Sequence, residues 1–106
     1  MNEITVNRRA YFDYEILDTY EAGMELHGFE VKAVKTGRIN LAGAFVVIKN
    51  EEARLLNATI PAYQPANAPA DYDPTRSRRL LLHRSEIKEL TGAASAKGLT
   101  IVPLKV

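Results

Sequence analysis

Cysteine and tryptophan are both missing from this sequence of 106 residues. The lack of cysteine excludes a disulfide framework, a thiol nucleophile and a thiolate metal site. No apolar run reaches about 18 residues, so no membrane-spanning helix and no membrane partner are expected. The first residues, Met-Asn-Glu-Ile-Thr, lack the charged and then apolar pattern of a signal peptide. We therefore expect a cytoplasmic protein.

Patterns typical of catalytic sites are also missing. His27 and His83 are the only histidines, and neither has a second ligand at metal spacing. No serine lies in a glycine elbow, and no glycine-rich phosphate loop is present. We therefore expect no enzyme activity, with no catalytic residue, metal, cofactor or small-molecule substrate.

The residues that are present are typical of a globular domain. Hydrophobic residues make up 46% of the chain and charged residues 25%. A chain of this length can bury one core, which predicts a single domain over residues 1–106. The net charge of +1 hides an asymmetry. Residues 1–30 carry seven acids and two arginines, whereas residues 31–106 carry twelve bases and six acids.

The order of apolar and polar residues predicts short strands and few helices. Phe12, Tyr14 and Ile16 alternate with acids, which indicates a strand with one buried face. Residues 30–36 have helical spacing, and Gly37 is a natural stop. Further strands are expected at residues 44–49, 54–60, 76–83 and 99–106, the first two joined by a turn at 50–52.

Proline and serine divide the rest of the chain. Residues 61–74 hold four of the five prolines and predict a long exposed loop. Ser85 is expected to cap a helix that has Glu86 in its first turn and ends before Gly98. Pro103 removes a ladder donor, which places the last strand at an edge or a bulge. Together these elements predict a small, mostly β, antiparallel barrel.

The strongest local signal is the stretch from Arg76 to Arg84, with four arginines, three leucines and no acid. The planar arginine fork grips phosphate, so we expect the leucines to enter the core and the arginines to point outward toward RNA or DNA. Exchanging Arg78 and Arg79 for glutamate is then expected to weaken RNA binding without harming the fold. The alternative is an edge strand whose charges prevent aggregation.

Two other features suit a polyanionic partner. Residues 31–50 carry four bases and no acid, namely Lys32, Lys35, Arg38 and Lys49. Tyr11, Phe12 and Tyr14 could stack on bases, as in proteins that bind single strands. Aromatic residues at period two lie more often in a core, so that alternative stays open.

A series of short motifs follows in order along the chain. They are Asn7-Arg8-Arg9-Ala10, Asp13-Tyr14, Thr19-Tyr20-Glu21-Ala22-Gly23, Gly28-Phe29-Glu30-Val31-Lys32, Gly37-Arg38-Ile39-Asn40-Leu41, Pro61-Ala62-Tyr63, the run from Asp73 to Arg84, and the run from Lys97 to Lys105. With these motifs the chain resembles the small protein B family, the SsrA-binding proteins of bacterial trans-translation. The resemblance extends from about Asn7 to the last residue.

The resemblance implies a fold and a function. Members of the family are barrels of the oligonucleotide-binding (OB) type with a few helices, here two or three short ones. They bind the tRNA-like domain of transfer-messenger RNA (tmRNA, or SsrA), and the two enter stalled ribosomes together. The stalled product then receives a degradation tag and the ribosome is rescued. The family has no catalytic role of its own.

The resemblance also implies RNA-binding positions. Glu21 would accept hydrogen bonds from bases or ribose, or would instead order the site by pairing with an arginine. Leu81 would pack on a base or ribose, or would instead lie in the core. Asn40 is either a turn residue or an RNA contact. The full expected set is Asn7, Arg8, Arg9, Glu21, Lys32, Lys35, Arg38, Asn40, Arg76, Arg78, Arg79, Leu81 and His83.

The sequence departs from the family pattern in places. Relatives continue past Pro-Leu-Lys-Val into a further hairpin and a basic tail, whereas this sequence stops at Val106. We therefore expect an apparently truncated barrel that still binds RNA, tends to self-associate and does not support tagging. Thr59 lies in a segment where relatives often carry histidine. Two alternatives remain, a generic binder of tRNA elbows or single strands and a protein-interaction barrel with an arginine-guarded edge; the salt dependence of binding separates nucleic-acid from protein partners.

Overall fold

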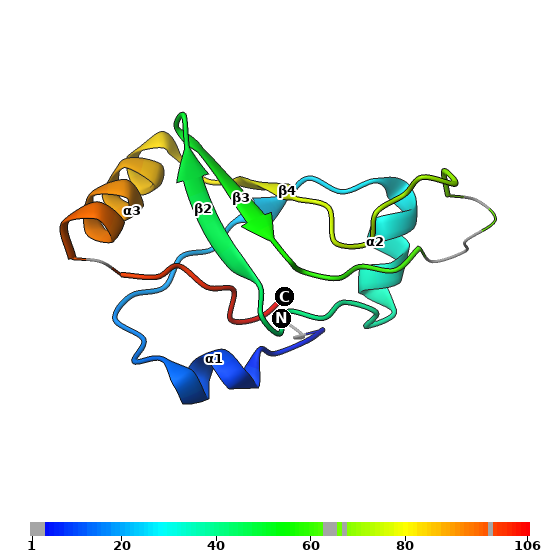
Figure 1. The fold of residues 1–106 in the computed structure, drawn as a ribbon, viewed down its shortest axis with the longest axis horizontal. Coiled ribbons are helices and arrows are strands. Elements are labelled where there is room, and N and C mark those ends of the chain that lie inside the picture. Colours follow the sequence, from blue (N-terminus) through cyan, green and yellow to red (C-terminus); the bar gives the residue numbers. More distant parts are fainter. Residues whose placement is uncertain (1–3, 63–65, 67, 98) are drawn as a thin grey trace.

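The computed structural model describes residues 4–62, 66, 68–97 and 99–106. In chain order its elements are α1 (Arg8–Asp13), β1 (Gly23–Met24), α2 (Gly28–Lys35), β2 (Phe45–Lys49), β3 (Glu52–Leu56), β4 (Arg78–Leu81) and α3 (Arg84–Lys97). The strands form one antiparallel sheet in the order β1-β4-β3-β2. Figure 1 shows α2 and α3 toward opposite ends of this sheet and α1 set apart from it. A small antiparallel sheet with few helices is thus confirmed, but the sheet is open, with β1 and β2 at its edges.

The predicted hairpin is formed by β2 and β3. Asn50 and Glu51 have φ angles of 54° and 60°, so both central residues of the turn are left-handed. Such a two-residue turn matches the twist of the flanking strands. The second strand is shorter than the predicted 54–60, because Asn57 is also left-handed, with a φ angle of 64°. Beyond it Thr59 pairs with Asn40 in an isolated bridge.

Helix α2 ends where the sequence predicts. Gly37 has a φ angle of 81°, and its N–H donates to the carbonyl of Val34 at 2.9 Å. The N–H of Arg38 donates to the carbonyl of Ala33, also at 2.9 Å. These two hydrogen bonds satisfy carbonyls of the last helical turn, as in a Schellman motif. The motif requires a left-handed residue just after the helix, which Gly37 provides.

The core is built by α2, by β3 and by the segments that follow each of them, residues 39–44 and 58–60. Burying this apolar surface supplies the main driving force for the fold. Its fully buried members are Ala33, Val34, Ile39, Leu41, Ala44, Leu55, Ala58 and Ile60. Met24, Leu26, Val46, Leu80 and Val106 pack against them, so the end of the chain closes one side of the core.

The strand predicted at residues 12–16 is wrong, because residues 8–13 form α1. Asn7 caps this helix, since its Oδ1 accepts the N–H of Ala10 at 3.3 Å. Ala10 is the buried residue of the helix, whereas Phe12 is 91% exposed. The alternation of aromatic and acidic residues therefore marks no buried face.

The last predicted strand, 99–106, is replaced by two isolated bridges. Ile101 pairs with Val46 at the edge of β2, and Lys105 pairs with Val6. Between them the carbonyl of Pro103 accepts the Asn7 side chain at 2.9 Å. A proline within the segment interrupts a continuous ladder, as its missing N–H requires. The two end segments of the chain consequently lie side by side.

Helix α3 begins two residues earlier than the predicted cap at Ser85 would place it, at Arg84 and not at Glu86. His83 precedes the first helical residue, and its N–H donates to Glu86 Oε1 at 2.9 Å. The carboxylate in the first turn thus reaches back to the residue before the helix, as in a capping box. Ser85 lies inside the helix, and Gly98 lies outside the described residues.

The described part of residues 61–74 forms no α-helix and no strand, as predicted. Residues 63–65 and 67, and with them Tyr63 of the Pro-Ala-Tyr motif, lie outside the described residues. The loop is not exposed throughout, because Tyr72 is half-buried. Its ring meets Phe29 edge to face, with centroids 4.7 Å apart. This contact fixes the end of the loop against α2.

Candidate nucleic-acid interface

Strand β4 places its arginines on two opposite faces. Arg78 and Leu80 point toward the core, and the Arg78 side chain is fully buried. Arg79 and Leu81 point outward, each about half exposed. The expectation that the arginines project while the leucines enter the core is therefore wrong for Arg78 and for Leu81. Successive residues of a strand face opposite sides, so the run of arginines divides between core and surface.

The buried Arg78 is neutralised by Glu30 of α2. Arg78 Nη2 donates to Glu30 Oε2 at 2.7 Å and Nε to the same oxygen at 3.1 Å. Arg76, less than one-third exposed, donates to both Glu30 oxygens. The Tyr72 hydroxyl lies 2.8 Å from Glu30 Oε2 and accepts from Arg78 Nη2 at 2.9 Å. A buried charge requires such pairing, and we call these four residues the Glu30 cluster.

The cluster perturbs the titration of two of its members. Burial would raise the pKa of Glu30, but hydrogen bonds from Arg76, the His27 backbone, Arg78 and Tyr72 outweigh it and lower the pKa to about 2. Burial and the hydrogen bond with the Glu30 carboxylate raise the pKa of Tyr72 to about 12. At neutral pH the carboxylate is therefore charged and the phenol is protonated.

A second group of predicted residues lies on or next to the outward side of the paired strands β1 and β4. Gly23 of β1 pairs with Leu81, and a Cβ at Gly23 would lie 3.3 Å from Leu81 Cβ and Cδ1. A side chain at position 23 would press on Leu81, so glycine suits this position. Glu21 lies two residues before Gly23 and is exposed, without an arginine partner among the residues that the structure describes. His83 follows two residues after Leu81 and is also exposed.

We call Glu21, Arg79, Leu81 and His83 the β4 surface. Arg79 is oriented within it by two acids, Glu52 at 3.4 Å and Glu25 at 3.8 Å. Such exposed ion pairs are weak, so the guanidinium can exchange them for a phosphate at little cost. The surface combines a cation, an apolar side chain and an acceptor, which together suit the phosphate, ring face and donor groups of RNA.

The predicted residues at the start of the chain have different environments. Asn7 is buried, and its Nδ2 donates to the carbonyls of Leu41 and Pro103 at 3.3 and 2.9 Å. Its amide is thus engaged within the protein. Arg8 and Arg9 are exposed on α1, where Arg9 Nε pairs with Asp13 at 3.2 Å.

The basic residues of α2 lie apart from β4. Lys32 and Lys35 are exposed in the last turn of the helix, and Arg38 is exposed just beyond it. Asn40 is a turn residue, because its Oδ1 accepts the N–H of Ala42 at 2.9 Å, and its side chain remains exposed. The expected basic residues thus lie on three parts of the structure: α1, the end of α2 with the residues just beyond it, and β4.

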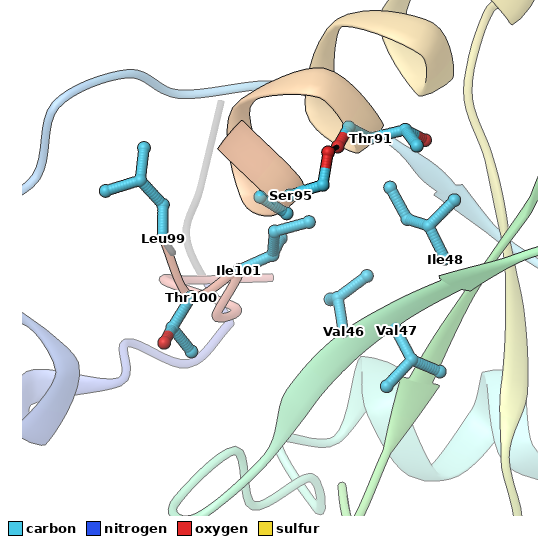
Figure 2. A pocket seen from close by; sticks show the side chains of 9 residues that line it. Val46, Val47, Ile48, Thr91, Ser95, Leu99, Thr100 and Ile101 are labelled. Atoms are coloured by element: carbon cyan, nitrogen blue, oxygen red, sulfur yellow. Dashed lines mark hydrogen bonds between the residues drawn. The ribbon is translucent and has the colours of Figure 1, made fainter. Parts of the chain in front are cut away.

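An apolar groove of about 480 Å³ lies between β2, α3 and residues 99–101 (Figure 2). None of its nine lining residues is charged, and the hydroxyls of Thr91 and Ser95 donate to helix carbonyls at 2.7 and 2.8 Å. Val46 borders the groove and donates its N–H to Ile101 at 2.9 Å. The lining of the groove is thus apolar apart from the hydroxyls of Thr91, Ser95 and Thr100.

Two kinds of feature are absent from the described ranges. Within residues 4–62, 66, 68–97 and 99–106, no three histidine, aspartate or glutamate side chains gather as metal ligands would. In the same part of the chain, no helix has the length and apolar character that crossing a membrane requires.

The sequence reasoning missed the Glu30 cluster and Arg54. Arg54 stands directly opposite Arg79 in the sheet, bonded to Glu52 at 3.2 Å and to the Ser77 hydroxyl at 3.2 Å. No local signal marks Arg54. For the cluster, the period-two alternation through Arg76, Arg78 and Leu80 was a usable signal, because it predicts arginines on the core face.

Comparisons with known proteins place the chain in a family. A family model described as "SmpB protein" matches residues 4–106. The SsrA-binding proteins of Gloeothece citriformis (strain PCC 7424) and Trichodesmium erythraeum (strain IMS101) are 53% and 48% identical over 103 residues. Each alignment covers 97% of this chain and 66% of the relative, so the chain spans just under two thirds of these proteins' length.

A solved structure agrees with the sequence matches. It is described as "tmRNA-SmpB: a journey to the center of the bacterial ribosome" and is 46% identical, with a TM-score of 0.75. The similarity covers 95% of this chain and 70% of that chain. The chain belongs to the SmpB protein family.

Proposed function

We propose that this chain binds the tRNA-like domain of tmRNA and helps deliver it to stalled ribosomes for peptide tagging and ribosome rescue. The observation that carries the proposal is the family match over residues 4–106, since the relatives are named SsrA-binding proteins. Its partners are then tmRNA and the ribosome, and its setting is the cytoplasm. The role is one of binding, with no catalytic residue.

The β4 surface supports this proposal by its chemistry. Arg79 supplies a phosphate contact, half-exposed Leu81 packs on a base or ribose, and Glu21 accepts hydrogen bonds from donor groups. His83 borders the same surface. Direct contacts are also assigned to the exposed Arg8, Arg9, Lys32, Lys35, Arg38 and Asn40. Asn7, Arg76 and Arg78 act instead by holding the surfaces that carry these residues.

The fold that we propose for the chain is an OB-type barrel, which forms a single RNA-binding domain over residues 1–106. Three contacts outside the open sheet support a barrel-like path. Ile101 pairs with the edge strand β2, Lys105 pairs with Val6, and Asn40 pairs with Thr59. These bridges connect the segments that flank the sheet and curve the chain around the core.

The test is a binding titration with a labelled tRNA-like domain, an equal length of perfect duplex RNA, and single-stranded DNA. The folded domain should win at physiological salt, because the family implies recognition of shape and unpaired loops. Equal affinity for all three would support a generic binder instead. Log affinity should fall linearly with log salt, whereas a flat response would favour a protein partner.

Arg79→Gln tests the surface itself. Loss of one phosphate contact should weaken binding about fivefold and reduce the salt slope by about one. Lys88→Gln on α3 is the matched control, since it removes one exposed positive charge elsewhere. If both variants bind like the parent protein, the β4 surface is not the interface.

A further inference from the structure

We propose that α1 is a second RNA-contacting element, in which Phe12 stacks on an unpaired base and Arg8 holds a neighbouring phosphate. The inference rests on the proposed RNA-binding function and adds to the expected contact of Arg8 a stacking contact by Phe12, a residue outside the family motifs. It is carried by four observations on α1: exposure, charge, shape and anchoring.

The first observation is the exposure of Phe12. Its side chain is 91% exposed, the highest value among the exposed large hydrophobic side chains of the described residues. The flanking aromatic residues Tyr11 and Tyr14 are 46% and 45% exposed. A phenylalanine held almost wholly in water contributes nothing to the core, and its ring face is open for stacking.

The second observation is the cation beside the ring. Arg8 and Phe12 are four residues apart on one helix, so their side chains lie on the same face. Arg9 is paired with Asp13 at 3.2 Å, which neutralises that carboxylate. Arg8 has no hydrogen-bond or ion-pair partner within the described part of the chain. One cation of the helix is therefore available for a phosphate.

The third observation is the shape between these groups. Arg8, Arg9, Phe12 and Asp13 line a shallow hollow of about 460 Å³. An aromatic face next to an arginine is the arrangement with which single-strand binders hold a base and its phosphate. The hollow has only one apolar ring between charged side chains. The lining carries two arginines and one acid, so its net positive charge favours a polyanion such as RNA.

The fourth observation is the anchoring of this short helix. Asn7 ties its start to the carbonyls of Leu41 and Pro103, and the Asn7 N–H donates to Leu104 at 2.6 Å. Ala10, 4% exposed, fixes the middle of the helix. The position of Phe12 is thus set before RNA arrives, which reduces the entropy cost of binding. In Figure 1 α1 lies on the far side of residues 101–106 from the sheet, so this surface is distinct from the β4 surface.

The sequence has no tryptophan, so Phe12→Trp places a single tryptophan at the proposed contact, which can be excited selectively in the presence of the five tyrosines. We expect its emission to be quenched by the tRNA-like domain, by a ten-nucleotide oligoadenylate, or by both; the RNA that quenches identifies the kind of strand bound. Ala96→Trp, at an exposed position of α3, is the matched control and should stay unquenched. Unchanged emission from the Phe12→Trp variant under saturating RNA of both kinds would overturn the proposal.

Binding measurements complete the test. Phe12→Leu keeps an apolar side chain but removes the ring, and it should weaken RNA binding about tenfold with an unchanged thermal midpoint. Arg8→Gln should reduce the salt slope by about one. If the parent chain binds RNA and both variants bind equally well, the α1 contact is refuted while the proposed function stands. If the parent chain binds no RNA, the proposed function itself fails.

Discussion

Replacing Glu30 with glutamine tests the charged cluster beneath β4. The carboxylate accepts six hydrogen bonds, from the His27 N–H, the Tyr72 hydroxyl and the Nε and Nη2 groups of Arg76 and Arg78. Glutamine keeps the shape but offers one carbonyl oxygen and an amide whose hydrogens face the guanidinium donors. The change therefore removes the counter-charge without creating a cavity.

The expected cost follows from the burial of Arg78. Its side chain is 0% exposed, so it cannot reach water once its partner is neutral. Breaking a buried pair and leaving one charge uncompensated costs about 3–5 kcal/mol. A domain of this size has a total stability of about 5–15 kcal/mol. At about 4 °C per kcal/mol or more, the melting temperature should fall by at least about 12 °C.

Urea unfolding followed by circular dichroism at pH 7 measures this cost. Glu25→Gln is the control, because its carboxylate is exposed and lies 3.8 Å from Arg79. The control should lose less than about 0.5 kcal/mol, as exposed ion pairs usually do. A loss below about 1 kcal/mol for Glu30→Gln would refute the reasoning, since Arg78 would then have found another way to be solvated or paired.

Three further predictions concern acid stability, a glycine and the cap of α1. The folded-state pKa of Glu30, about 2, lies below its ordinary 4.5, so its stabilisation is complete above about pH 5 and is lost as the pH falls toward 2. Between pH 6 and pH 2, urea unfolding should show that the free energy of unfolding falls by about 3 kcal/mol, and the Glu30→Gln variant should lack this loss. Gly23→Ala should cost about 1 kcal/mol in thermal unfolding, because the added Cβ lies 3.3 Å from Leu81; an unchanged midpoint would show that Leu81 moves freely. Asn7→Ala should cost about 1–2 kcal/mol by urea unfolding through the lost cap and carbonyl contacts, and no loss would mean that water replaces the amide.

The sequence predicted elements whose signals are local. The β2–β3 hairpin and the end of α2 depend on turn residues and on Gly37, which act within a few positions. The alternation of Phe12 and Tyr14 predicts a buried strand and hides the helix at residues 8–13, although Asn7 is a favourable cap for that helix. Period two does not distinguish a buried strand from exposed aromatic residues that serve a surface.

The candidate site is predictable from the sequence only where its signals are local. The motif residues Glu21 and Leu81 were named from the sequence, and the β1–β4 pairing brings their segments together. The structural role of Arg78 cannot be predicted from the sequence, because its partner Glu30 is 48 residues away along the chain. Composition shows that acids and bases are present, but only the fold shows which of them meet.

Alternation along β4 separates two tasks that the sequence assigns to the whole run of arginines. Arg78 faces inward and is fixed by a carboxylate, so changing it alters the fold first and any RNA contact second. Arg79 faces outward and has only weak, exposed ion-pair partners, so changing it should leave the core intact and test the proposed RNA contact alone. The sequence alone suggests exchanging both Arg78 and Arg79 for glutamate as a test of RNA binding. The exchange at Arg78 would place a second carboxylate beside Glu30 and unfold the surface whose RNA binding is to be tested. Because Leu80 and Leu81 divide in the same way, one strand supports the core with one face and presents the candidate interface with the other.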